Sequence, residues 1–431
     1  METMDIFLNP ERSSWKALTE RCRRSDEEIT RQTAEIINEV RSGGDRALHD
    51  ITRRIEGRDC GSFEVTAGER RAAASHMPEA LKEALGTAKK NIEAFHRAQL
   101  PREVDIETMP GVRCSQRSVP IRRVGLYIPG GKAPLFSTVL MLAVPARVAG
   151  CREVILCTPA RADGSVAPEI LYTADLCGVD RIYTAGGAQA IAAMAYGTDS
   201  IPRADKIFGP GNRYVTKAKQ LVSADGIAVD LPAGPSEVLV LADDGASPRF
   251  VAADLLSQAE HGGDSQAMLV CSSERFARDT MEAVEEQMRR LQRADTIREA
   301  LRQSRIIVFD SHEKMIAFAD AYAPEHLIIS MRDAREVAGQ ITAAGSIFIG
   351  PWSPESAGDY ASGTNHTLPT GGLARAWSGV NTESFMHRIT CQELTRDGLS
   401  ALAPSIIAMA EAEGLGAHAE AVRIRLKKDS L

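Results

Sequence analysis

The sequence predicts an α/β protein with two parallel-sheet domains, each an incomplete Rossmann-like unit, and with helical N- and C-terminal extensions. The first observation is the length of 431 residues, which is too great for one hydrophobic core and favours two large domains. The second is an alternation of short apolar strands with helices that begins near residue 121 and begins again near residue 236. The third is helical apolar spacing near both ends of the chain.

Each predicted element follows from its local pattern. Helices are expected over residues 25–55 and 79–100, before Pro101. In the first series, strands are expected over 122–131, 153–159, 181–187 and 205–211, and helices over 134–150, 167–178, 190–198 and 214–222. In the second series, strands are expected over 236–243, 266–272, 305–310, 326–330 and 346–351, and helices over 247–261, from about 273, over 313–323 and over 334–345.

These elements divide the chain into four parts. Residues 1–24 form an N-terminal extension, and residues 25–126 plus 238–380 form a first, discontinuous α/β domain. Residues 127–237 form a second α/β domain. Residues 381–431 form a C-terminal extension whose amphipathic helix is too small to fold alone, so we expect it to dock on another surface.

Composition narrows the class of protein. An apolar content of 44%, a charged content of 25% and a net charge of -7 are typical of a soluble globular protein. The absence of a long basic run argues against nucleic acid and against an anionic membrane as main partners. The first residues lack the pattern of a signal peptide, and eight scattered cysteines without a Cys-x-x-Cys pair indicate reduced thiols in a cytoplasm. The same spacing argues against a zinc site built from cysteine.

Three glycine-rich turns follow strands of the second domain. They cover residues 127–134, 184–190 and the Gly209-x-Gly211 turn, in which Tyr214 occupies the third glycine position of a dinucleotide fingerprint. Alone, the Gly209 turn is either a nucleotide contact or a plain tight turn. Three such turns at the carboxyl ends of strands in one domain favour a cofactor site, because open α/β sheets bind ligands at that edge.

Several polar residues stand out in the remainder of the chain. Gln258 and His261 fall on the last turn of one predicted helix, with their Cβ atoms about 5–6 Å apart. They are either two ligands of one metal ion or simply the polar end of a helix. The polar loop 355–372 contains Asp359 and His366, which are candidate ligands or bases. Further candidates are Glu413 and His418, at the head of the C-terminal helix, where a lone histidine is often only a surface residue.

Glu325 and His326 place an acid beside a base. Pro324 keeps the preceding residue out of a helix, and residues 326–330 continue as a strand, so the pair lies at a helix-to-strand junction. Glu325 and His326 either serve as a cap and a packed side chain or belong to a reactive site.

Taken together, these segments resemble the histidinol dehydrogenase family. The matching strings lie in order between about residues 120 and 426, and the helical N-terminal third fits more loosely. They are VGLYIPGGKAPLFSTVLMLAVPARVAGC, GGAQAIAAMAYGT, KIFGPGNRYVTKAK, PAGPSEVLVLAD, DLLSQAEHG, YAPEHLII, SPESAGDYASGTNHTLPTGG and AEAEGLGAHAEAVRIRL.

The resemblance implies an activity, two cofactors and a set of site residues. It implies that L-histidinol is oxidised to L-histidine in two NAD-dependent steps, the last step of histidine biosynthesis, through a bound aldehyde and with one zinc per site. It implies that Glu325 and His326 form the acid–base pair. The implied zinc ligands are Gln258, His261, Asp359 and His418, and the implied NAD contacts are Tyr127, Gln189 and Asn212. The implied substrate contacts are Ser236, His326 and Glu413, together with the four zinc ligands.

The resemblance also implies a domain-swapped homodimer, in which the C-terminal extension carries Glu413 and His418 into the site of the partner subunit. Lys132 departs from the family pattern and is suited either to cofactor phosphates or to solvent. Three alternatives remain open: a relative that oxidises another small amino alcohol or diol, a zinc hydrolase in which Glu325 activates a water, and a non-catalytic metal-binding module.

Overall fold

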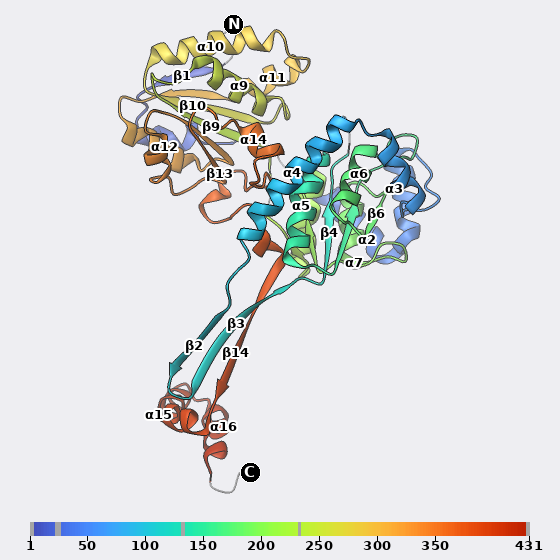
Figure 1. Cartoon of the computed structure of the whole chain (residues 1–431), viewed down its shortest axis with the longest axis vertical. Helices are drawn as coiled ribbons and strands as arrows, with labels where there is room; N and C mark the ends of the chain where they lie inside the picture. The colour runs from blue at the N-terminus through green and yellow to red at the C-terminus, as the bar shows by residue number, and fades with distance from the viewer. Residues whose placement is uncertain (1–3, 22–26, 131–133, 232–233, 428–431) are drawn as a thin grey trace.

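Two parallel sheets and one antiparallel ribbon organise the molecule (Figure 1). The computed structural model of the chain describes residues 4–21, 27–130, 134–231 and 234–427. Each parallel sheet lies at the centre of its own α/β body, and the ribbon leads away from both bodies to the C-terminal helices. The predicted α/β fold with parallel sheets is therefore confirmed.

The first body is built on a six-stranded parallel sheet. Its strands, in spatial order, are β1 (Asp5–Leu8), β11 (Arg305–Val308), β10 (Gln266–Cys271), β9 (Glu237–Ala242), β12 (His326–Ser330) and β13 (Ser346–Ile349). Every residue of β9 and β10 is buried, so both faces of the sheet are covered. One face packs on α9 (Pro248–Ala259), α10 (Glu274–Met288) and α11 (Ala294–Leu301), and the other on α1 (Trp15–Leu18), α12 (His312–Tyr322) and α13 (Ala334–Ala338).

The second body is built on a five-stranded parallel sheet. Its strands, in spatial order, are β6 (Arg181–Tyr183), β5 (Glu153–Cys157), β4 (Arg123–Tyr127), β7 (Lys206–Phe208) and β8 (Ala228–Val229). The strand order reverses direction between β4 and β7. One face packs on α3 (Ala67–Ala73), α4 (Glu79–Ala98), α5 (Phe136–Ala149) and α6 (Pro168–Leu176), and the other on α2 (Glu27–Ile51), α7 (Gly187–Tyr196) and α8 (Arg213–Ala224).

The structure corrects the predicted domain boundaries. Residues 25–126 were expected to fold with 238–380, but α2, α3 and α4 pack on helices α5 to α8 of the second body. Residues 1–24 are not a separate extension either, because β1 adds a strand to the edge of the six-stranded sheet. An amphipathic pattern shows that a helix has an apolar face, but it does not show which of two similar bodies that face will meet.

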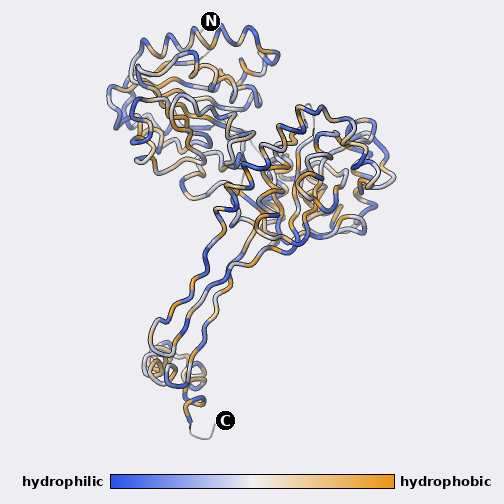
Figure 2. The backbone as a smooth tube through the Cα atoms, viewed as in Figure 1, coloured by the Kyte–Doolittle hydropathy of each residue, from blue (hydrophilic) through white to orange (hydrophobic). Residues whose placement is uncertain are grey.

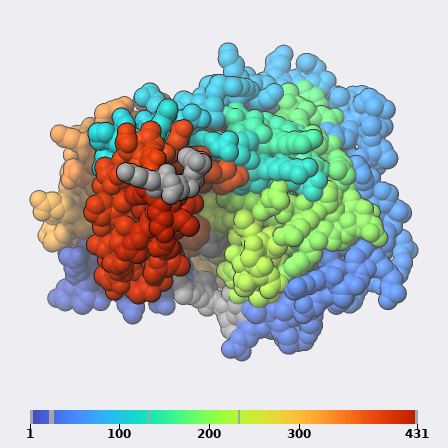
Figure 3. Space-filling model, turned by 90° about the horizontal axis from the view of Figure 1, so that it is seen from below, coloured from blue at the N-terminus to red at the C-terminus, as the bar shows by residue number. Residues whose placement is uncertain are grey.

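The ribbon was not predicted. It pairs β2 (Val104–Met109), β3 (Val112–Pro120) and β14 (Met386–Leu394) in antiparallel order. The expected C-terminal helical extension of 381–431 therefore contains a nine-residue strand, which follows a short 3-10 helix over Thr382–Phe385. The helices α15 (Arg396–Ala412) and α16 (Gly416–Leu426) follow it. Figure 2 shows hydrophobic segments gathered in the two bodies, whereas the ribbon alternates between hydrophilic and hydrophobic positions. Seen from below, the C-terminal helices stand in front of the bodies as a separate mass (Figure 3).

Two further observations bear on the predicted class of protein. Across the part of the chain that the structure describes, no helix has both the length and the apolar composition that crossing a bilayer requires. The seven cysteines within the described ranges are free thiols, four of them buried.

Candidate active site

A sharp corner places Glu325 and His326 at the amino end of β12, an inner strand of the six-stranded sheet. Helix α12 ends at Tyr322, and Ala323 then adopts a left-handed conformation with φ 50°, which is rare for a residue with a side chain. Pro324 follows, and β12 starts at His326 beside the first residues of β9. Both side chains of the predicted acid–base pair are buried.

His326 lies among three carboxylates. Its Nδ1 atom is 3.6 Å from Oε1 of Glu355 and 3.8 Å from Oε2 of Glu325. Its Nε2 atom is 3.6 Å from Oδ1 of Asp359 and has no hydrogen-bond partner. Nδ1 lies 3.3 Å from the backbone oxygen of Glu237, so a proton on Nδ1 is held there and Nε2 is left facing Asp359.

Burial and charge shift the pKa values of this group in opposite directions. Burial raises the pKa of Glu325 to about 8 and that of Glu355 to about 7. Burial favours the neutral form of His326, but the carboxylates of Glu355 and Glu325 outweigh it and raise its pKa to about 10. Burial would also raise the pKa of Asp359, but His326 outweighs it, so the pKa of Asp359 is lowered.

The predicted pair on helix α9 lies beside this group. The helix ends at Ala259, and a further hydrogen bond from the backbone N–H of His261 to the oxygen of Gln258 continues its last turn (3.2 Å). Gln258 is fully buried, and neither its amide oxygen nor its amide nitrogen has a hydrogen-bond partner. A buried amide without partners is costly, at about 1–3 kcal/mol, so its persistence points to a ligand that is not part of the chain.

A short helix brings the remaining carboxylates into the same place. Helix α14 (Glu355–Tyr360) starts after Pro354, and Glu355 and Asp359, four residues apart, lie on one of its faces. His261, Glu355 and Asp359 offer ligand atoms that all lie within 4.8 Å of one another. The structure thus brings together two predicted residues of the first body, His261 and Asp359, and adds Glu355, while Gln258 lies one turn before His261.

Glu355 is the residue that the sequence analysis missed. Its side chain is 1% exposed, and neither carboxylate oxygen has a hydrogen-bond partner. The available signal was its spacing of four from Asp359 directly after a proline, which is typical of the first turn of a helix. That spacing predicts two carboxylates on one face.

A loop connects this site to the second body. After α14, the backbone oxygen of Asp359 lies 3.0 Å from Nδ1 of His366, whose Nε2 is 3.4 Å from the Thr138 hydroxyl on α5. Asn365 donates to the backbone oxygen of Met141 on the same helix (2.6 Å). Ser236, a predicted substrate contact, lies directly before β9, and its backbone oxygen accepts from Gln266 (3.2 Å). The loop that follows the site therefore packs on helix α5 of the second body.

The predicted cofactor contacts gather at the carboxyl edge of the five-stranded sheet. Tyr127 ends β4, and its hydroxyl accepts from the backbone N–H of Gly187 (3.0 Å). Gln189 donates to Glu56 (3.2 Å), and Asn212 caps α8 by accepting from the N–H groups of Tyr214 and Val215. The three residues lie at the edge at which open sheets bind ligands, and their contact with NAD stays a prediction.

Gly209 shows how closely the turns at this edge approach one another. Its φ is 128°, and a Cβ atom there would lie 2.1 Å from the backbone oxygen of Tyr127. Only glycine fits such a position. The Gly209-x-Gly211 turn and the end of β4 therefore form one continuous backbone surface.

The remaining predicted residues lie elsewhere in the chain. Glu413 and His418 are exposed on the C-terminal helices, at the far end of the ribbon from both sheets (Figure 1). Within the described residues of one chain, they do not join the group around His326. Lys132 lies outside the described residues.

Comparison with known proteins identifies close relatives over the whole chain. The family model for histidinol dehydrogenase matches residues 19–426. Histidinol dehydrogenase from Bacteroides fragilis is 53% identical over 425 residues, which is 99% of each chain. The enzyme from Escherichia coli is 53% identical over 404 residues, covering 93% of this chain and 92% of the relative. The crystal structure of histidinol dehydrogenase from Elizabethkingia anophelis superposes with a TM-score of 0.97 at 49% identity, covering 99% of this chain and 98% of that one.

Proposed function

The chain belongs to the histidinol dehydrogenase family, and on that premise we propose that it converts L-histidinol to L-histidine in two successive oxidations at one zinc-containing site. As a member of this family it is an oxidoreductase that acts on histidinol with NAD. The proposal adds that the intermediate aldehyde stays bound between the two steps. The observation that carries the proposal is the buried pair Glu325 and His326. Oε2 of Glu325 lies 3.8 Å from Nδ1 of His326, and Nε2 of His326 faces the carboxylate of Asp359.

The residues of the first body fit a zinc ion. Gln258 has a buried amide without partners, and the ligand atoms of His261 and Asp359 lie within 4.8 Å of each other. We assign these three residues as ligands and His418 of a second subunit as the fourth. Zinc, when bound, supplies a Lewis acid and an attachment point for the amine and imidazole nitrogens of the substrate. Glu355 adds a further buried carboxylate that balances the charge of such a cation.

His326 serves the first oxidation. Its Nε2 atom has no hydrogen-bond partner and faces Asp359, so it is the atom that takes the proton of the substrate hydroxyl. With a pKa of about 10 the ring would already carry that proton at neutral pH. A cation held by Asp359 and placed beside Glu355 would offset the negative charge that raises this pKa, so that Nε2 could accept a proton. NAD, when bound at the edge formed by Tyr127, Gln189 and Asn212, supplies the acceptor for each hydride.

Glu325 serves the second oxidation. Its Oε2 atom accepts a hydrogen bond from the backbone N–H of Glu237 (2.9 Å), which fixes the carboxylate and leaves Oε1 to take a proton from water. The oxygen of that water adds to the aldehyde carbon, and the resulting hydrate then loses the second hydride. Burial raises the pKa of Glu325 to about 8. A general base works best with a pKa near the working pH, so this shift suits the role.

The substrate side of the proposal uses residues from two subunits. Ser236 lies one residue before Glu237, and we assign it, with His326 and the zinc ligands, to the substrate site. Glu413 of a second subunit is proposed to hold the substrate's cationic or hydrogen-donating groups. The exposed position of Glu413 and His418 at the end of the ribbon supports a domain-swapped homodimer, because these residues have no route to the site of their own chain.

A substrate panel tests this proposal. Zinc-loaded protein is mixed with NAD and with L-histidinol or other small amino alcohols and diols, and NADH absorbance is followed. NADH formation that is fastest with L-histidinol supports the proposal, and faster oxidation of another amino alcohol would reassign the substrate. Hydrolysis of esters or amides without NADH formation would favour a zinc hydrolase, with Glu325 as its base.

A further inference from the structure

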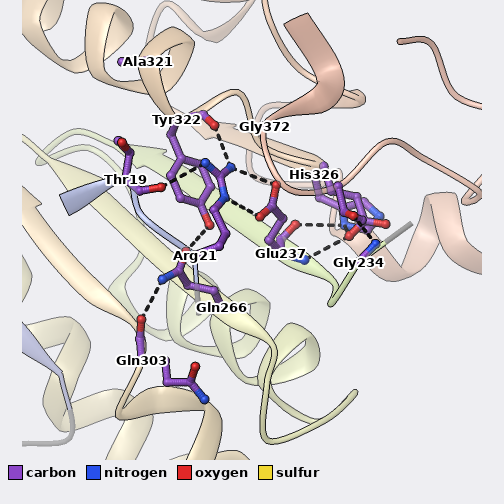
Figure 4. A network of polar contacts seen from close by, with 12 residues as sticks. Thr19, Arg21, Gly234, Glu237, Gln266, Gln303, Ala321, Tyr322, His326 and Gly372 are labelled. Carbon is purple, nitrogen blue, oxygen red and sulfur yellow. Dashed lines mark hydrogen bonds and ion pairs between the residues drawn. The ribbon is translucent and has the colours of Figure 1, made fainter. Parts of the chain in front are cut away.

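The guanidinium of Arg21 connects the N-terminal segment to the candidate site (Figure 4). Arg21 donates two hydrogen bonds to the carboxylate of Glu237, from Nε to Oε2 (2.8 Å) and from Nη2 to Oε1 (2.9 Å). It also donates to the backbone oxygen of Tyr322 (2.6 Å), and its guanidinium lies 3.7 Å from the centre of the Tyr322 ring. The Arg21 side chain is 18% exposed and that of Glu237 only 2%.

The backbone of Glu237 contacts both members of the acid–base pair. Its N–H donates to Oε2 of Glu325 (2.9 Å), and its carbonyl oxygen lies 3.3 Å from Nδ1 of His326. The orientation of one residue therefore sets the position of both reactive side chains. The Glu237 side chain is in turn held by the bidentate contact with Arg21, which is the most direction-specific ion pair available to a carboxylate.

Arg21 also fixes the other side of the same corner. Tyr322 is the last residue of α12, three residues before Glu325, and Ala323 between them holds a left-handed conformation. The Tyr322 hydroxyl donates to Oε1 of Gln266 (2.6 Å), and Gln266 donates onward to the backbone oxygen of Gln303 (2.8 Å). One guanidinium thus joins the start of β9 to the end of α12 (Figure 4). Glu325 follows Tyr322 by three residues in the chain and accepts from the N–H of Glu237.

We propose that Arg21 is a positioning residue, which acts through Glu237 and the Tyr322 carbonyl to hold Glu325 and His326 in their reactive geometry. The assignment of a catalytic pair rests on the proposed function. The contacts themselves are independent of it. Lysine is a poor substitute, because a single ammonium group cannot reproduce the planar two-point contact.

Steady-state kinetics of Arg21→Lys and Arg21→Met test the proposal. We expect kcat to fall on the order of 10- to 100-fold in Arg21→Met, because small misplacements of reacting groups have effects of that size. The KM for NAD and the zinc content stay at their wild-type values. Arg21→Lys recovers part of kcat. The matched control is Arg305→Met, because Arg305 also anchors the N-terminal segment, through the Leu18 carbonyl (3.0 Å), but makes no hydrogen bond to Glu237 or Tyr322.

A double variant separates positioning from folding. Arg21→Met leaves a buried carboxylate without its partner, whereas Arg21→Met with Glu237→Gln removes that charge and restores the fold. If Arg21 only supports the fold, kcat returns with the melting temperature in the double variant. If it positions the pair, kcat stays low. A wild-type kcat in Arg21→Met, or an equal loss of kcat in Arg305→Met, would overturn the proposal.

Amide hydrogen exchange gives a readout that does not depend on turnover. We expect peptides covering residues 234–240 and 322–328 to exchange faster in Arg21→Met than in wild type or Arg305→Met. Unchanged exchange in both peptides would overturn the positioning role even if the enzyme oxidised a different substrate. Wild-type protein that makes no NADH from L-histidinol would instead count against the proposed function.

Discussion

Glu325 and His326 are adjacent in the chain, and their side chains approach the same backbone residue from two directions. Neighbouring side chains on an extended strand point to opposite faces. Here Glu325 accepts from the N–H of Glu237, while His326 contacts the carbonyl oxygen of the same residue. Two groups at one site but at different positions suit two proton transfers, one from an alcohol and one from a water.

This division of labour predicts different losses in two variants. Glu325→Gln should slow aldehyde oxidation by about 10²–10⁴-fold while alcohol oxidation is largely spared, because only the second step needs a base for water. His326→Gln should damage both steps. Single-turnover measurements with histidinol and with histidinaldehyde distinguish the half-reactions. Equal losses in both half-reactions for both variants would refute the assignment.

The orphaned amide of Gln258 predicts opposite effects on stability and on metal binding. In Gln258→Leu, the free energy of unfolding of metal-free protein should rise by about 1–3 kcal/mol, because the unpaired amide is removed. Zinc affinity should fall by more than about 10-fold, the lower end of the loss seen when even an outer partner of a metal site is removed.

Urea unfolding in a chelator and zinc titration against a competing chelator measure the two effects. Gln258→Glu serves as the control, since it retains an oxygen donor for zinc but places a further charge in the metal-free site. Unchanged zinc affinity in Gln258→Leu would remove Gln258 from the ligand set.

At the residue scale, the sequence indicates which side chains are reactive better than it indicates which other side chains surround them. The patterns at 325–326 and 258–261 leave a structural and a functional role open, and it is the family resemblance that assigns them an acid–base pair and two zinc ligands. Glu355 was missed because its importance comes from burial beside His326, and burial depends on how α14 packs. The spacing of Glu355 from Asp359 predicts a shared helix face, but the contact of that face with His326 is seen only in the three-dimensional structure.

At the scale of elements, a buried ion pair holds the Gly209 turn. The Lys219 ammonium on α8 donates to the backbone oxygen of Gly209 (2.9 Å) and pairs with Asp230, which accepts from the N–H of Gly209 (2.7 Å). The side chains of Lys219 and Asp230 are 3% and 1% exposed. Both backbone groups of the turn are thus fixed from inside the protein, which leaves its outer surface free for a ligand.

The ion pair predicts a specific loss of cofactor binding. Lys219→Met should lower the free energy of unfolding by about 3–5 kcal/mol, because Asp230 is left as an uncompensated buried charge. The KM for NAD should rise while the KM for histidinol changes little. Lys219→Met with Asp230→Asn should regain stability but not NAD affinity, since the Gly209 carbonyl still lacks its donor. A parallel rise in both KM values would contradict a role confined to the cofactor edge.

The local sequence pattern predicts individual helices and strands, but it does not predict strands that pair with a distant part of the chain. The strands of both α/β series are present because each is a short apolar run between turn residues. The ribbon escaped the analysis because β3 pairs with β14 across more than 260 residues, and its strands are exposed on both sides. Alternation such as Val104-Asp105-Ile106-Glu107 in β2 is compatible with a strand, but it does not indicate which distant segment that strand pairs with.

At the scale of the whole molecule, the ribbon separates Glu413 and His418 from the site to which the proposed function assigns them. Both residues are exposed, and the ribbon has hydrophobic side chains in solvent, including Val104 (45% exposed) and Ile106 (54%). In the proposed homodimer, a second copy of the chain covers these side chains and supplies His418 to the site. The domain boundaries were harder to predict, because α2 to α4 carry apolar faces that suit either body.

Subunit mixing tests the shared site. His326→Gln and His418→Ala should each be inactive, yet a mixed population of the two should regain about a quarter of wild-type activity, because half of the dimers are mixed and each of these has one intact site. The measurement is NADH formation after the two variants are dissociated and reassociated together. Each variant treated alone is the control. No recovery in the mixture would place His418 in the site of its own chain.

The stoichiometry of the reaction tests the central claim most directly. With limiting L-histidinol and excess NAD, the account predicts two NADH and one L-histidine for each histidinol consumed, with no aldehyde released to a trapping reagent. One NADH per histidinol, with free aldehyde in solution, would contradict a site in which Glu325 and His326 carry out two steps in succession.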